Sequence, residues 1–209
     1  MSDLDLLVCA ATAMELQTFS MELQTFGAAG SSFLTGVGTP SALAQTLTIA
    51  GRLKPRRILN LGIAGAYPGS GLSLGDIVIG QSEVYGDVGF ALPEAPYFRH
   101  IGESEWGEFY RTPLPLMQFA EFPVLHLGSG CTVNTCTGTE AVGRLRETLF
   151  QAHFETMEGA AVAQAGQTLG IPVCEIRAIS NFASTRDMRP QNIRLALAAL
   201  TAYFSAHRK

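Results

Sequence analysis

The stretch that decides the fold covers residues 153–181 and reads HFETMEGAAVAQAGQTLGIPVCEIRAISN. Its first half is rich in glycine and alanine, which predicts a slender helix that can lie close against a sheet. Gly170 is placed to end this helix, and Pro172 prevents its continuation. Residues 173–179 form a short, partly β-branched run between turn residues, as a central parallel strand would. The stretch therefore predicts a strand end, a helix, a tight turn and a second strand.

Two polar residues stand at the ends of this unit. Glu158 opens the predicted helix, and Asn181 closes the predicted second strand. In open α/β sheets, ligands bind beyond the carboxyl ends of the strands, and both residues fall there. We therefore expect their side chains to converge on a small molecule. The alternative for Asn181 is that its amide only caps a turn.

Composition limits the classes of protein that fit. The 209 residues suit one domain, residues 1–209, and the net charge of −4 gives no support to nucleic-acid binding. Met1 is followed by Ser-Asp-Leu-Asp, and no apolar run approaches the roughly 20 residues of a membrane span. We expect no signal peptide, no membrane partner and a cytoplasmic location. The low charged fraction of 15% favours surface buried between subunits, in a homodimer or higher homo-oligomer.

The four cysteines do not indicate a metal or a disulfide framework. They are scattered, and Cys131 and Cys136 lack zinc-type spacing and neighbouring histidines. We expect reduced thiols, no metal and no cofactor.

A short sequence occurs twice near the N-terminus. Met-Glu-Leu-Gln-Thr-Phe occupies residues 14–19 and again residues 21–26. The seven-residue period predicts one helix after a first strand. Glu15 then lies in the first turn at the strand end, while Glu22 lies about two turns further, roughly 10 Å along the axis. Only Glu15 is expected at a strand-end site; the alternative is that it merely favours the helix dipole.

The remaining segments predict alternating strands and helices around one sheet. A glycine turn, Gly36-Val37-Gly38, precedes a helix and is either an anion site or a structural turn. Residues 81–122 hold most of the aromatic side chains and read as a long insertion or lid. Further strands are expected at residues 4–11, 32–37, 57–62, 74–80 and 123–130, and further helices at residues 39–51, 140–150 and 190–207.

Three blocks of sequence resemble a known family, the purine nucleoside phosphorylase and nucleosidase superfamily. They are Asn60-Leu61-Gly62-Ile63-Ala64-Gly65 with the following Leu74-Gly75-Asp76-Ile77-Val78, then Met157-Glu158-Gly159-Ala160-Ala161, and finally Arg177-Ala178-Ile179-Ser180-Asn181. Within the superfamily the likeness is greatest to the futalosine hydrolases, through Ala10-Ala11-Thr12, Thr132-Val133-Asn134-Thr135 and Arg186-Asp187. The resemblance implies a nucleoside phosphorylase-like α/β fold, a three-layer α/β/α domain with a central mixed, twisted sheet.

The resemblance also implies roles for individual residues. Glu15 would activate the attacking water, and Met157 would pack under the ribose. Glu158 would accept hydrogen bonds from ribose hydroxyls, and Asn181 would face N7 and O6 of the base. Adenine-specific nucleosidases carry Asp at the position of Asn181, and an aromatic residue at the position of Val133.

Further contacts complete the predicted site. The backbone at Ile63 and Gly65 would approach the substrate closely, and Val133 would contact it in place of the aromatic residue. Arg99, in residues 81–122, is either a solvated surface residue or the partner of a substrate carboxylate.

The implied activity is hydrolysis of the N-glycosidic bond of a small-molecule nucleoside, futalosine, in menaquinone biosynthesis. Methylthioadenosine or adenosylhomocysteine nucleosidase, purine nucleoside phosphorylase and a non-catalytic nucleoside-binding protein are the alternatives. Retention of both Glu15 and Glu158 argues against simple binding, which does not need a carboxylate to activate water.

Overall fold

The computed structural model describes residues 4–26, 29–95, 98–185 and 187–207. Arg186, part of the resemblance above, lies outside them. None of the helices in this described part of the chain is both long and apolar enough to cross a membrane.

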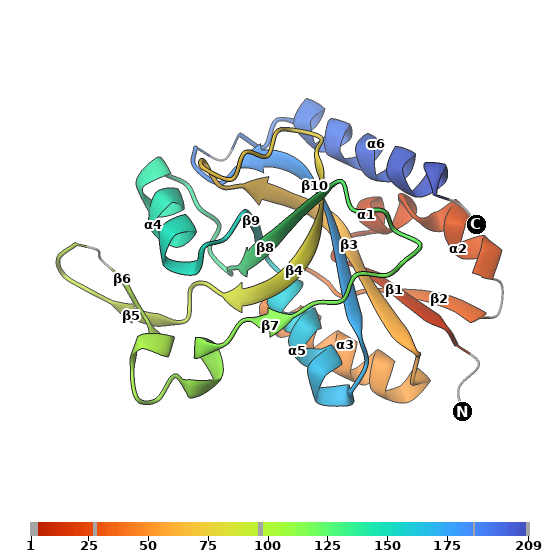
Figure 1. The fold of residues 1–209 in the computed structure, drawn as a ribbon, viewed down its shortest axis with the longest axis horizontal. Helices are drawn as coiled ribbons and strands as arrows, with labels where there is room; N and C mark the ends of the chain where they lie inside the picture. Colours follow the sequence, from red (N-terminus) through yellow and green to blue (C-terminus); the bar gives the residue numbers. More distant parts are fainter. Residues whose placement is uncertain (1–3, 27–28, 96–97, 186, 208–209) are drawn as a thin grey trace.

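A mixed sheet forms the centre of the molecule (Figure 1). The strands of the described residues are β1 (Leu6–Ala10), β2 (Gly30–Leu34), β3 (Arg57–Ala66), β4 (Ile77–Tyr85), β5 (Gly89–Ala91), β6 (Phe98–His100), β7 (Leu114–Pro115), β8 (His126–Thr132), β9 (Phe154–Thr156) and β10 (Val173–Phe182). The order is β10-β4-β8-β9-β3-β1-β2, with β7 beside β4 and β5 and β6 in a separate hairpin. Because β10 also pairs in parallel with β3, five of these strands close into a ring.

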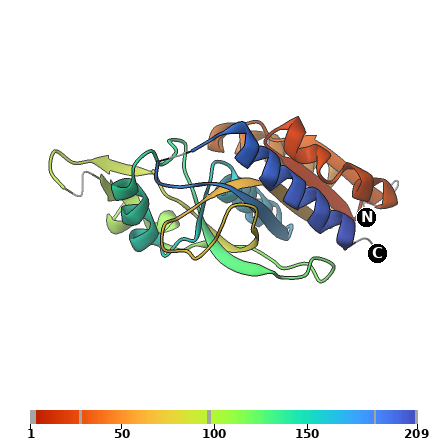
Figure 2. The ribbon, with the colours of Figure 1, turned by 90° about the horizontal axis from the view of Figure 1, so that it is seen from above.

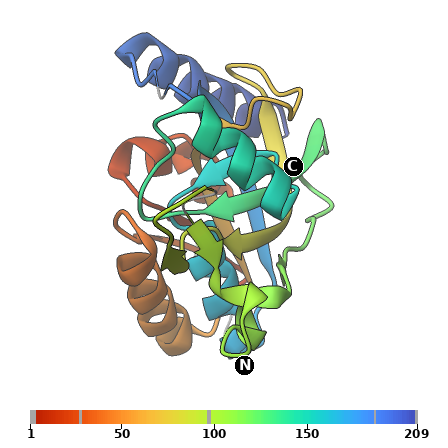
Figure 3. The same cartoon turned by 90° about the vertical axis from the view of Figure 1, so that its left-hand side faces the viewer.

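Helices cover both faces of the sheet. They are α1 (Ala13–Gln17), α2 (Ser20–Phe26), α3 (Thr39–Leu53), α4 (Glu140–Phe150), α5 (Gly159–Leu169) and α6 (Pro190–Ala206), with short 3-10 segments η2 (Ile101–Glu103) and η3 (Glu108–Arg111). Figure 2 shows α6 beside α1 and α2, and Figure 3 shows α6 and α3 on opposite sides of the sheet. The predicted α/β fold with a mixed central sheet and flanking helices is confirmed.

The core consists of two main apolar layers, one on each face. Along β1, Leu6 and Val8 contribute to the layer under α6, whereas Leu7 and Cys9 contribute to the layer under α3 and α5. Side chains of a strand alternate between faces, so an uninterrupted apolar strand fills both layers.

The helix–turn–strand unit forms as predicted. α5 ends at Gly170, whose φ of 68° lies in the left-handed region. A Cβ on Gly166 would come within 2.3 Å of Val173 Cγ2, so glycine is required where the helix meets β10. β10 is buried along almost its whole length.

The repeated sequence does not form one helix, and that prediction was wrong. Residues 18 and 19 are a turn between α1 and α2. Thr18 N and Phe19 N donate to Glu15 O and Leu16 O, three residues back, and Thr18 Oγ1 also donates to Glu15 O at 2.7 Å. These bonds tighten the chain, and Phe19 enters the core against Phe204, with ring centroids 4.7 Å apart.

Several predicted strand bounds also differ. β4 continues past Gly80, where its pairing with β8 shifts register between Gly80 and Ser82, so residues 81–85 are not part of an irregular insertion. β8 begins at His126 rather than at Pro123, and β2 ends at Leu34 rather than at Val37. The rest of the predicted insertion contains the β5–β6 hairpin, η2, η3 and β7, and the hairpin projects from the body (Figures 1 and 2).

Candidate active site

A cavity of about 240 Å³ opens at the carboxyl ends of β1, β3 and β10. Of the predicted site residues, it brings together Glu15, Ile63, Gly65, Met157, Glu158 and Asn181. Its other walls come from Ala11, Thr12, Met14, Val37, Ala64, Cys136, Glu155, Thr156, Ser180, Met188, Ile193 and Leu197. Polar groups therefore converge inside an otherwise apolar hollow, as ligand sites require.

Glu15 is held by three donors. Its Oε2 accepts from Thr12 N at 3.0 Å and from Thr12 Oγ1 at 2.7 Å, and its Oε1 accepts from Ile63 N at 3.0 Å. Thr12 is also the N-cap of α1 and accepts from Glu15 N, which makes a reciprocal capping box. The carboxylate is thus fixed between the ends of β1 and β3, where it faces the cavity.

Glu158 forms the N-cap of α5 and is buried. Its Oε1 accepts from Gly38 N at 2.9 Å. The helix dipole favours the ionised form, but burial acts in the opposite direction and raises the pKa of Glu158, against the lowering effects of Arg177 and the Gly38 amide. The backbone donor of the glycine turn is consequently engaged by a carboxylate of the chain itself.

Asn181 has a defined amide orientation. Its amide nitrogen lies 3.1 Å from Phe182 O, which can only accept, so this atom must be Nδ2. Oδ1 then accepts from Ser180 Oγ at 3.0 Å. Nδ2 lies over Gly65, where an added Cβ would be only 2.9 Å away. An amide nitrogen has two protons, and Phe182 takes one, which leaves one N–H for a ligand.

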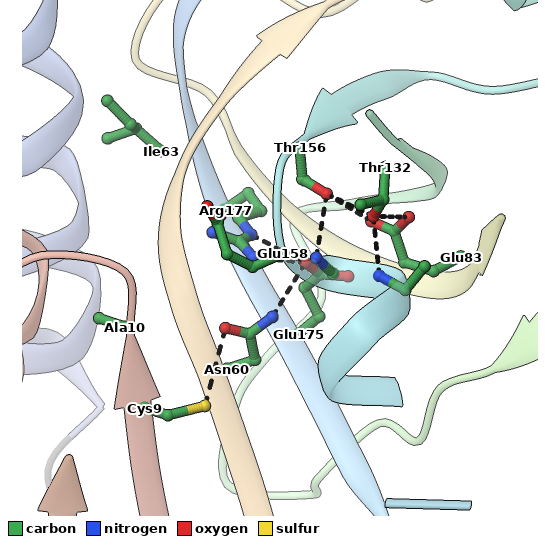
Figure 4. A network of polar contacts seen from close by, with 12 residues as sticks. Cys9, Ala10, Asn60, Ile63, Glu83, Thr132, Thr156, Glu158, Glu175 and Arg177 are labelled. Carbon is green, nitrogen blue, oxygen red and sulfur yellow. Dashed lines mark hydrogen bonds and ion pairs between the residues drawn. The ribbon is translucent and has the colours of Figure 1, made fainter. Parts of the chain in front are cut away.

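Arg177 is the largest fully buried side chain of the described residues, and sequence reasoning assigned it no role. Its Nε donates to Glu175 Oε1 at 2.8 Å (Figure 4). A Cβ on Gly62 would meet Arg177 Nη1 and Glu15 Oε1 at 2.4 and 2.6 Å, so the guanidinium and this carboxylate flank one glycine. The signal was present in the sequence, because two charged residues interrupt the apolar run of β10.

Val133 lies away from the cavity. It is fully buried in an apolar cluster with Tyr67, Cys131, Ala152 and Ala183. Its neighbour Asn134 reaches the start of α3 instead, accepting from Thr39 N at 3.1 Å. The structure does not bring Val133 to the other predicted site residues.

Glu155 is a second polar residue of the wall that sequence reasoning missed. Its carboxylate accepts from Thr137 N at 2.8 Å, Tyr67 Oη at 3.1 Å and Arg146 Nη1 at 3.0 Å. It therefore ties the segment before α4 to the strand that leads to Met157 and Glu158.

Arg99 is exposed on β6. It donates to Glu103 O at 3.3 Å and is not among the residues that line the cavity.

The comparisons with known proteins agree with this geometry. The model of the phosphorylase superfamily matches residues 27–205. The chain is 36% identical to a futalosine hydrolase of Thermus thermophilus over 83% of this chain and 80% of that protein. It is 30% identical to a 5′-methylthioadenosine/S-adenosylhomocysteine nucleosidase of Shewanella oneidensis, over 72% of this chain and 65% of that protein.

The chain belongs to the phosphorylase superfamily. Within it, the chain is a member of the family of purine nucleosidases, N-glycosyl hydrolases, that includes futalosine hydrolases and methylthioadenosine nucleosidases. The structure of a methylthioadenosine nucleosidase from Arabidopsis thaliana superposes with a TM-score of 0.76 at 18% identity, covering 97% of this chain and 93% of that one, which shows the shared fold.

Proposed function

We propose that the protein is a futalosine hydrolase, which splits futalosine into hypoxanthine and dehypoxanthinyl futalosine for menaquinone biosynthesis. The orientation of the Asn181 amide carries the proposal. Hypoxanthine presents O6 and N7 as acceptors, whereas adenine presents an amino donor in place of O6. An amide N–H at the cavity wall therefore suits a 6-oxopurine, and a site built to pair a polar group discriminates strongly against a mismatched analogue.

The residues of the cavity have matching chemical roles. The Glu15 carboxylate takes a proton from water as the water oxygen bonds to the anomeric carbon. The glycosidic bond breaks, and its electron pair leaves with the base, whose negative charge Asn181 stabilises by hydrogen bonding. Glu158 accepts from ribose hydroxyls and stabilises the positive charge that develops on the sugar. Met157 packs against the ribose, and the backbone at Ile63 and Gly65 forms the wall beside the base.

Phosphorolysis is the second enzymatic candidate, and one contact argues against it. The glycine turn would have to donate backbone N–H groups to phosphate, but Gly38 N already donates to Glu158 Oε1. Water then remains as the nucleophile. The apolar mouth, with Met14, Val37 and Met188, offers space for the aromatic ring in the tail of futalosine.

A substrate panel tests the proposal. Pure protein is incubated with futalosine, inosine and methylthioadenosine, with and without phosphate, and free base is measured. We expect futalosine to be cleaved fastest without any effect of phosphate, and Asn181→Asp to lower kcat/KM for futalosine relative to its 6-amino counterpart. A parent protein that prefers the amino compound would overturn both the assignment and the role of Asn181.

We also propose that the protein assembles as a homodimer or a higher oligomer. Trp106 and Phe109, near the projecting hairpin, are exposed aromatic side chains, and a second copy would place them, together with Arg99, within reach of a neighbouring cavity. Sedimentation that gives only the 22.3 kDa monomer at micromolar concentration would contradict this.

A further inference from the structure

We propose that Glu83 carries a proton in the native protein, shares it with Glu175, and acts as a positioning residue for Glu158. The protonation part of this inference stands by itself, whereas the positioning part rests on the proposed nucleosidase function. The groups involved gather around the N-terminal turn of α5 (Figure 4).

Two carboxyl groups meet in the core at this point. Glu83 and Glu175 are each 0% exposed, on the adjacent strands β4 and β10. A Cβ on Gly159 would lie 2.2 Å from Glu83 Oε1 and 2.7 Å from Glu175 Oε1, so both carboxyls crowd the same glycine. Two negative charges this close cannot both persist without water, and one proton between them removes the conflict.

Within the described part of the chain, only one buried cation lies close enough to offset these charges. Among the described residues, the buried positive partner is Arg177, which is bonded to Glu175 through Nε and lies 2.8 Å from it through Nη2. Asn60 Nδ2 adds a donor to the same oxygen, Glu175 Oε1, at 3.3 Å. Glu175 is therefore the ionised member of the pair, and Glu83 is the member that keeps the proton.

The hydrogen bonds at Glu83 can accommodate that proton, because the single hydroxyl proton of Thr156 can go either to Glu83 Oε1, at 3.1 Å, or to Thr132 Oγ1. Thr132 Oγ1 donates to Glu83 Oε2 at 2.8 Å and accepts from Ala160 N at 2.7 Å. Thr156 Oγ1 accepts from Gly159 N at 3.2 Å and can donate to Thr132 Oγ1 at 2.9 Å. Glu83 Oε1 is then free to donate toward Glu175, whose Oε2 otherwise has no hydrogen-bond partner within the described residues.

Other groups around Glu83 do not supply an alternative charge. Tyr85 on β4 and Cys131 on β8 are buried, and burial raises the pKa of both, so they stay neutral. β9 contributes Thr156, and β7 pairs with Glu83 through Leu114. Burial, followed by the negative charge of Glu175, raises the pKa of Glu83 well above its usual range.

The pair connects to the active site along two routes. Thr156 accepts from the amide of Gly159, and Thr132 accepts from the amide of Ala160. These two amides directly follow Glu158. Arg177, held by Glu175, acts electrostatically on Glu158 and lowers its pKa against burial. If Glu83 lost its proton, a second buried negative charge would compete for Arg177 and weaken its hold on Glu158.

The proton has a definite effect on stability. The native pKa of Glu83 lies above the value of the unfolded chain, about 4.3. Between these two pKa values the native protein holds a proton that the unfolded protein has released. The free energy of unfolding therefore decreases as pH rises from the unfolded pKa toward the native pKa of Glu83. Glu83→Gln, whose amide is always neutral, removes this dependence.

Two measurements that need no substrate test the proton. Infrared difference spectra of parent and Glu83→Gln at pH 7 should show a carboxylic-acid C=O band that only the parent has. Across pH 5–7, the folding equilibrium constant of the parent should fall relative to that of Glu83→Gln by about tenfold per pH unit. The absence of the band, or parallel stability curves, would overturn the shared proton.

Rescue by the conservative variant tests the positioning role. Glu83→Leu removes the acceptor of the Thr132 hydroxyl and should lower kcat/KM for the cleaved nucleoside by about tenfold or more. Glu83→Gln should recover most of that loss and extend activity to higher pH. Equal losses in both variants, or none in either, would reject the role. If no nucleoside is cleaved by the parent, the proposed function fails, while the infrared band and stability curves still decide the proton.

Discussion

The two copies of Met-Glu-Leu-Gln-Thr-Phe have the same letters and different structures around them. Glu15 of the first copy faces the cavity between β1 and β3, whereas Glu22 of the second copy is buried against α6, where Ser205 Oγ donates to its Oε1 at 3.1 Å. Local geometry is the same in one respect, because Thr18 Oγ1 and Thr25 Oγ1 each donate to the carbonyl of the glutamate three residues earlier at 2.7 Å.

The residue three positions before each glutamate accounts for the difference. Before Glu15 this is Thr12, which caps α1 and binds the carboxylate through two donors. Before Glu22 it is Phe19, which has no donor in its side chain and packs into the core. The hexapeptide sequence alone therefore does not determine the role of its glutamate. The capping residue and the neighbouring strand determine it.

The largest effect is expected for Glu15→Gln. Glutamine keeps the shape of the side chain but cannot take a proton from water, so kcat should fall by about 10²–10⁴-fold while substrate still binds. Glu22→Gln is the matched control in an identical hexapeptide and should stay within about twofold. Steady-state kinetics and substrate binding are measured for both. Loss of turnover in the control alone would reverse the roles of the two copies.

Phe19→Ala should have the next largest effect, on stability. The ring is buried and packs edge-on against Phe122 and Phe204, so truncation should lower the free energy of unfolding by about 3–5 kcal/mol. Met21→Ala, at a side chain that is 58% exposed, is the control and should change it by less than about 0.5 kcal/mol. Urea denaturation of both variants decides the point; similar midpoints would mean that the turn does not anchor the first copy.

A smaller effect is expected for Thr12→Val, which removes the hydroxyl that caps α1 and donates to Glu15. The free energy of unfolding should fall by about 1 kcal/mol, and kcat should fall by roughly tenfold because the carboxylate loses a charge-assisted hydrogen bond. Thr12→Ser keeps the hydroxyl and should restore both quantities. If valine and serine behave alike, the two backbone donors, the N–H groups of residue 12 and Ile63, are sufficient to orient Glu15.

These contrasts also show where sequence reasoning reached its limit. α5 and β10 were predictable because glycine, proline and an apolar run mark them locally. Glu158 and Asn181 both line the cavity, but not because parallel strands end at one edge, since β9 runs antiparallel to β3 and β10 runs parallel to it. The break at Thr18 was not predictable from the seven-residue period, because it depends on a core pocket for Phe19 between distant rings. The position of Val133 in an apolar cluster was not predictable for the same reason, since its apolar neighbours come from three other segments.

Register and buried charge were likewise beyond local patterns. β4 extends past Gly80 because its pairing with β8 shifts register there. The sequence of residues 74–80 gives no sign of that shift. Arg177 and Glu175 could be seen as two charges on one face of an apolar strand, but the proximity of Glu15 appears only when β3 and β10 lie side by side.

The smallest expected effect is that of Glu22→Gln on stability. Glutamine retains an oxygen that can accept from Ser205 Oγ, so the contact between α2 and α6 is kept while one buried negative charge is removed. A single exchange of this kind should change the free energy of unfolding by less than about 1 kcal/mol. Ser205→Ala removes the donor from the other side and should give a change of similar size, with kcat unaffected in both variants. Thermal and urea denaturation measure the difference. A loss of several kcal/mol in Glu22→Gln would show that the ionised carboxylate itself holds α2 against α6. The glutamate of the second copy would then stabilise the fold through its charge, whereas that of the first copy serves the cavity.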